Sequence, residues 1–91
     1  MSNLRPSGNV LVAHLEGEAV LLDLTTKRYF RLNSTSAAIW RAVEDGKSRE
    51  EIVQALLGAF EVDESVATDA VDSTIEDLAR RGLLRDSSDN G

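Results

Sequence analysis

The spacing of apolar positions changes once along the chain, from the two-residue alternation of strands to the three- and four-residue spacing of helices. Residues 10–15, 18–24 and 27–32 are rich in valine, leucine and aromatic side chains, as strands are. Glu16-Gly17 separates the first two segments and Thr25-Thr26 the last two. Connections this short predict an antiparallel meander, with the three strands adjacent in chain order.

The two turns also predict the register of the sheet. With turn centres at Glu16-Gly17 and Thr25-Thr26, Leu21 faces Phe30, and Asp23 faces Arg28 as a cross-strand ion pair. Both faces of the sheet are then apolar, so either the helices wrap around it or a partner covers the second face. One face carries Val12, Ala19, Leu21, Phe30 and Leu32, and the other carries Leu11, Ala13, Val20, Leu22 and Tyr29.

The first predicted helix follows directly after the third strand. Asn33 or Ser34 is suited to cap it, because both side chains can accept a hydrogen bond from the first turn. Ile39 and Trp40 lie on its apolar side, where we expect them to pack in the core. Gly46 stands where a helix of this length closes.

Two more helices complete the predicted fold. Ser48 and Glu51 have capping-box spacing and open the second helix, and Gly58 is expected to end it. Asp63 is expected to cap the third helix over residues 64–82. The apolar residues of the two helices recur at spacings of three and four. They are Ile52, Val53, Leu56 and Leu57 in the second, and Ala67, Ala70, Val71, Thr74, Ile75 and Leu78 in the third.

This order predicts an α+β domain with a winged helix-turn-helix-like architecture, in which a three-stranded antiparallel sheet is followed by three helices. We expect the domain to span residues 10–85. Residues 1–9, which contain Pro6 and Gly8, are expected to be a flexible N-terminal arm, and the polar residues 86–91 a frayed tail.

Composition narrows the class of protein. The chain has 91 residues, a formal net charge of −6 and no cysteine. A single domain is therefore expected, without disulfides or thiolate metal sites. No apolar run approaches the roughly 18 residues of a membrane span, and the first residues lack a signal-peptide pattern, so a cytoplasmic location is the default expectation.

Residues that could perform chemistry are sparse. His14 is the only histidine, and neither a G-x-S-x-G motif nor a glycine-rich phosphate loop is present. We therefore expect no metal, no cofactor and no catalysis. Asp72-Ser73 matches the dipeptide of acyl and peptidyl carrier proteins. The carrier alternative is disfavoured because Ser73 falls late in the chain, inside a predicted helix, and the chain begins with strands.

The segment from Tyr29 to Trp40 resembles the PqqD-like family, the recognition elements of pathways that modify ribosomally made peptides. The family pattern is an aromatic strand, then Leu-Asn, a Ser or Thr cap, small residues and Ile-Trp. Here the segment reads Tyr-Phe-Arg-Leu-Asn-Ser-Thr-Ser-Ala-Ala-Ile-Trp. The resemblance covers about residues 10–85. Later features occur in matching order, namely Gly46, Ser48, Glu51, Leu78, Gly82, Leu83 and Leu84.

The resemblance implies a winged helix-turn-helix fold that binds a leader peptide as a fourth strand, in a groove walled by the last helix. It is nearest to the stand-alone leader-binding proteins of lasso-peptide clusters, which work with a separate leader peptidase or other modifying enzyme. A PqqD-type chaperone of a quinone-cofactor precursor is the alternative within the family. The implied peptide-binding residues are Lys27, Arg28, Tyr29, Phe30, Arg31, Leu32, Val71, Asp72, Ile75, Glu76, Leu78 and Ala79.

A winged-helix DNA-binding regulator is the alternative outside the family. A helix that reads DNA carries basic and amide side chains on its exposed face. The predicted third helix instead has six acidic residues from Asp63 to Asp77, with Arg80 and Arg81 as its only bases. This composition disfavours nucleic acid as a partner, and the acidic residues could instead attract the lysines of a bound peptide.

Overall fold

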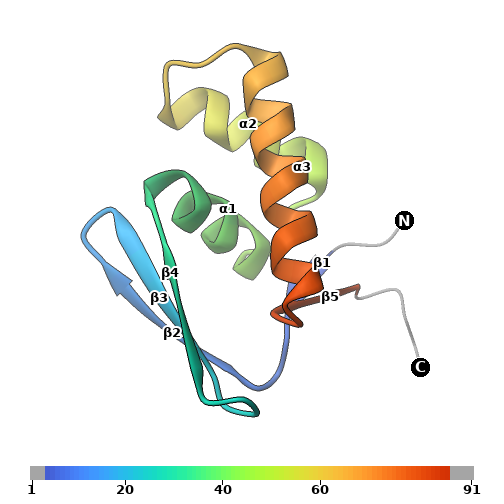
Figure 1. The fold of residues 1–91 in the computed structure, drawn as a ribbon. Helices are drawn as coiled ribbons and strands as arrows, with labels where there is room; N and C mark the ends of the chain where they lie inside the picture. Colours follow the sequence, from blue (N-terminus) through green and yellow to red (C-terminus); the bar gives the residue numbers. More distant parts are fainter. Residues whose placement is uncertain (1–3, 87–91) are drawn as a thin grey trace.

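The computed structural model describes residues 4–86, and its main sheet has the predicted order and register (Figure 1). Strands β2 (Val10–Leu15), β3 (Glu18–Asp23) and β4 (Arg28–Leu32) form an antiparallel meander in the order β2-β3-β4. Leu21 pairs with Phe30 and Asp23 with Arg28, as predicted. The α+β fold class and the three-stranded antiparallel sheet are therefore confirmed.

The turn between β3 and β4 differs from the prediction in one contact. The structure records no ion pair between Asp23 and Arg28 among residues 4–86, although the two residues face each other. The Asp23 carboxylate instead accepts hydrogen bonds from the backbone N–H groups of Thr25 and Thr26, at 2.9 and 3.3 Å. Lys27 has a φ of 63° and closes the turn, so β4 begins at Arg28 rather than at Lys27.

Three helices follow the sheet, as predicted. Helix α1 (Ser34–Glu44) is capped by Asn33, and α2 (Arg49–Ala59) by the capping box of Ser48 and Glu51. Helix α2 continues past Gly58 and ends at Ala59, because Gly58 lies inside the last hydrogen-bonded turn. Helix α3 (Glu64–Arg80) has Asp63 at its N-cap position, but that side chain makes no capping hydrogen bond. None of the described helices is long and apolar enough to cross a membrane.

The segments at the two ends of the domain differ from the expected flexible arm and frayed tail. Strand β1 (Leu4–Pro6) pairs antiparallel with β5 (Leu84–Asp86), beside the C-terminal end of α3 (Figure 1). Ser7 continues this contact, because its N–H donates to the Leu83 carbonyl at 3.0 Å. A three-residue strand whose partner lies some 80 residues away leaves no periodic signal in the sequence. The rest of the expected arm and tail, residues 1–3 and 87–91, lies outside the described residues.

The core lies between the sheet and the helices, and it uses only one face of the sheet. Leu21, Ile39 and Trp40 are buried, and the three helices lie on the same side of β2-β3-β4 (Figure 1). On the opposite face Leu11 and Tyr29 remain 55% and 72% exposed. Of the two alternatives left by the sequence, the described helices therefore do not wrap around the sheet.

Candidate functional site

The outer edge of β4 is open. In residues 4–86, β4 pairs with β3 on one side and with no strand on the other. The Asp23 carbonyl accepts from the Lys27 N–H, and the Leu24 N–H donates to Asn9 beside β2. Because hydrogen-bonding directions alternate along a strand, Arg28, Phe30 and Leu32 bond toward β3. The N–H and C=O groups of Tyr29 and Arg31 therefore point out from the open edge.

A groove runs beside this edge. It encloses about 250 Å³ between β4 and the last turns of α3. Four consecutive residues of β4 form one wall, and Asp77 and Leu78 of α3 form the other together with Arg81, the C-cap residue of that helix. The lining residues are Tyr29, Phe30, Arg31, Leu32, Asp77, Leu78 and Arg81. A backbone edge and a cleft for side chains thus lie next to each other, which is the arrangement that adding a peptide strand requires.

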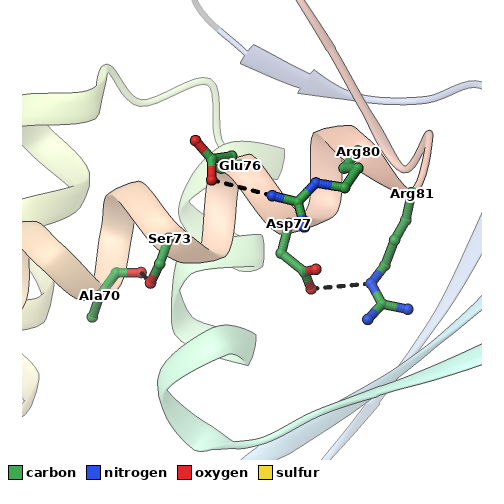
Figure 2. Close-up of polar contacts among 6 residues, drawn as sticks. All are labelled: Ala70, Ser73, Glu76, Asp77, Arg80 and Arg81. Atoms are coloured by element: carbon green, nitrogen blue, oxygen red, sulfur yellow. Dashed lines mark hydrogen bonds and ion pairs between the residues drawn. The ribbon is translucent and has the colours of Figure 1, made fainter.

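A charged pair from α3 lies over the aromatic residue of the groove. The guanidinium carbon of Arg81 is 5.3 Å from the centroid of the Phe30 ring, within the range of a cation–π contact. Its Nε donates to Asp77 Oδ2 at 3.0 Å, one helical turn earlier. Figure 2 shows Asp77 and Arg81 projecting toward the strands, while Glu76 and Arg80 project from another side of the helix. The side of α3 that faces the groove is therefore both basic and acidic.

Five of the six site residues predicted around β4 lie in the strand itself. Tyr29, Phe30, Arg31 and Leu32 line the groove, and Arg28 begins the strand. Lys27 is in the preceding turn. Phe30 is partly buried on the face that α1 covers, whereas Tyr29 projects from the uncovered face. Tyr29 therefore contributes its backbone to the groove, and Phe30 contributes its ring.

Of the predicted residues on α3, only Leu78 lines the groove. Val71 is fully buried in the core, and Ile75 packs against that core. Asp72 faces α2, where Arg49 donates to its two carboxylate oxygens at 2.6 and 2.7 Å. These hydrogen bonds hold the pKa of the Asp72 carboxyl below its usual value.

Glu76 and Ala79, the other predicted residues on α3, are exposed. Glu76 accepts a hydrogen bond from Arg80 at 3.2 Å, away from the groove. Neither residue lines the groove. The structure thus brings the predicted strand residues together but directs most of the predicted helix residues elsewhere.

Asp77 and Arg81 are the lining residues that sequence reasoning missed. They are four residues apart, so they lie on one side of the helix, about 100° and 60° respectively around the axis from Leu78. That acid–base spacing was visible in the sequence. It could not be assigned to the groove without knowing which side of α3 faces β4.

Other parts of the described surface do not offer the same combination. A larger cavity of about 470 Å³ lies between the β2–β3 hairpin, α1 and α2, and its lining includes five alanines of the two helices. It shares no residue with the groove. Strand β2, whose outer edge also pairs with no strand among residues 4–86, contributes only its last residue, Leu15, to this cavity. His14 contacts Glu44 at 3.1 Å and Arg41 at 3.4 Å, both residues of α1, and it does not line the groove. Within residues 4–86 no cluster of three His, Asp or Glu side chains could hold a metal ion.

Comparison of the chain with known proteins identifies the family to which it belongs. The chain is similar to TbiB1, solved in complex with the TbiA(β) leader peptide, with 36% identity over 89% of this chain and 94% of that chain and a TM-score of 0.84. It is also similar to a lasso peptide synthetase B1 complexed with the leader peptide, with 28% identity over 91% of this chain and 98% of that chain and a TM-score of 0.83. Among functionally curated proteins no sequence matches. The family model for coenzyme PQQ synthesis protein D matches residues 18–84, from the start of β3 to the start of β5 and across both walls of the groove, and the chain therefore belongs to the PqqD family.

Proposed function

We propose that this protein binds the leader peptide of a ribosomally made precursor as an added strand on β4 and presents it to a separate processing enzyme, in a pathway of the lasso-peptide type. The observation that carries the proposal is the open edge of β4 lying along a groove closed by α3. The protein acts by binding, in the cytoplasm, and the chemistry belongs to the partner enzyme.

The similar solved structures support this role. Two chains that resemble this one over nine-tenths of its length were each solved with a leader peptide. The family model independently matches residues 18–84, which include β3, β4 and α3, the elements that build the open edge and the groove. A leader peptide is therefore the class of ligand best supported for this site.

The energetics require the groove as well as the edge. Each hydrogen bond to the peptide nets only about 0.5–1.5 kcal/mol, while ordering each peptide residue costs about 1–2 kcal/mol. Micromolar binding needs about 8 kcal/mol, so apolar side chains must supply the surplus at roughly 1.5–3 kcal/mol for each one fully buried. Phe30, which is only partly buried, offers that apolar contact next to the strand edge, whereas Leu32 and Leu78 line the groove with only 6% and 3% of their surface exposed.

An NMR titration tests the proposal. We expect the TbiA(β) leader peptide, added to the ¹⁵N-labelled chain, to shift the amides of Tyr29 and Arg31 most, followed by those of Leu78 and Arg81. Amides of α2 serve as the internal control, because α2 contributes nothing to the groove. Shifts confined to α2 or to the uncovered face of the sheet, or no shift at millimolar peptide, would contradict strand addition at β4.

A further inference from the structure

Positive charge is concentrated beside the groove of an otherwise acidic protein. The chain has a net charge of −6, yet five of its ten Lys and Arg residues lie on β4, on the turn before it or at the C-terminal end of α3. They are Lys27, Arg28, Arg31, Arg80 and Arg81. The strand and the helix end that border the groove are therefore more basic than the molecule as a whole.

Part of this charge is not neutralised by the protein. Arg31 pairs with Glu18, Arg80 with Glu76 and Arg81 with Asp77. Within residues 4–86, Lys27 and Arg28 have no ion-pair partner. The one carboxylate opposite Arg28 is that of Asp23, which is 8% exposed and accepts hydrogen bonds from the turn. An arriving ligand thus meets a net positive charge where β4 begins.

Two of these arginines relate to Phe30, the aromatic residue of the groove: Arg81 lies over its ring, and Arg28 shares its face of β4. Arg28 lies two residues before Phe30, so both belong to the same face of β4. Arg81 approaches the same ring from α3 and uses its Nε on Asp77, which leaves its two Nη groups as donors (Figure 2). A side chain that enters the groove over Phe30 therefore meets Arg81 on its helix side, and Arg28 follows on the same face of β4, two residues before the ring.

From this arrangement we infer that the bound leader peptide carries an acidic residue at an inward-facing position, and that Arg28 and Arg81 bind its carboxylate. The inference rests on the proposed function and names the side-chain chemistry that the groove selects. It also replaces the expectation that acidic residues of α3 attract peptide lysines. Asp72, Glu76 and Asp77 are each already paired with an arginine.

The test selects peptides without assuming a leader sequence. A display library of random 14-residue peptides is selected on the wild-type protein, and the enriched peptides are then measured by fluorescence anisotropy. We expect Asp or Glu at a fixed distance from an apolar anchor. Changing that acid to its amide should weaken binding to the wild type about ten- to a hundredfold, as expected for the loss of a hydrogen bond to a charged group. The same change in the peptide should have little effect on its binding to the double variant Arg28→Gln/Arg81→Gln.

Controls separate this inference from the proposed function. Arg80→Gln removes a neighbouring charge outside the groove and should keep the preference for the acid. Arg28→Gln alone changes an exposed residue, so it serves if the double variant folds poorly. If the enriched peptides do not bind the Arg31→Pro variant but have no recurrent Asp or Glu, the inference is overturned and strand addition is still supported. Enriched peptides that bind Arg31→Pro as well as the wild type would overturn both.

Discussion

Proline at Arg31 tests strand addition directly. The N–H of Arg31 points out from the open edge of β4, because its neighbours Phe30 and Leu32 bond toward β3. Proline removes that N–H and places its ring where a peptide strand would lie. The pairing of β4 with β3 needs no donor from Arg31, and proline is tolerated on edge strands whose N–H faces outward.

Arg31→Ala is the matched control for the lost side chain. Both substitutions remove the ion pair with Glu18, whose N–O distance is 3.0 Å. The side chains of Arg31 and Glu18 are 76% and 41% exposed. Loss of this ion pair should therefore change the free energy of unfolding by no more than about 1 kcal/mol and should have little effect on peptide affinity. Only the proline variant also loses a backbone hydrogen bond to the peptide, worth about 0.5–1.5 kcal/mol, and adds a steric clash. We therefore expect proline to weaken binding at least about tenfold, and alanine less than about twofold.

The assay is fluorescence anisotropy with the labelled TbiA(β) leader peptide, or with a peptide selected as described above. Thermal unfolding followed by circular dichroism checks that both variants remain folded. Equal losses of affinity for the two variants, with both folded, would refute strand addition at β4.

Two further predictions concern the scaffold. Hydrogen bonds from Arg49 hold the pKa of Asp72 below its usual value of 3.8, so their stabilising effect is present above about pH 4 and is lost as the pH falls through the lowered pKa. Asp72→Asn should lower the urea unfolding midpoint at pH 7, and its difference from the wild type should shrink as the pH falls below about 4; an equal decrease at every pH would refute the assignment. Removing residues 1–7 should lower the free energy of unfolding, measured in urea, by about 2 kcal/mol, because it deletes β1 and uncovers Leu84, which pairs with it. An unchanged urea midpoint would show that β1 does not stabilise the domain.

The meander and the helices were predictable because their signals are local. Glu16-Gly17 is a two-residue connection, and Gly17 has the positive φ of 75° that such a turn favours. Its position fixed which residue of β2 faces which residue of β3. The capping box at Ser48 and Glu51 is likewise contained within four residues. Each of these features requires no knowledge of distant parts of the chain.

The pairing of β1 with β5 and the residues on the α3 wall were not predictable in the same way. Leu-Arg-Pro is too short to show alternation, and proline is depleted in strands. On α3, the apolar stripe predicted the side that faces the core, where Val71 and Leu78 are buried. The groove lies to one side of that stripe, so identifying Asp77 and Arg81 required the position of β4 relative to the helix.

An open strand edge is also a site where identical chains can pair, so a protein that keeps one must discourage its own copies. On β4 this edge is short, since Tyr29 and Arg31 alone present outward backbone groups. Lys27, Arg28 and Arg31 surround it, and a second copy paired antiparallel through the same edge would bring these like charges together, which is unfavourable across neighbouring strands. An acidic peptide experiences the opposite effect from the same residues. The charges that keep the edge free of other copies are therefore the charges that would favour the ligand proposed for it.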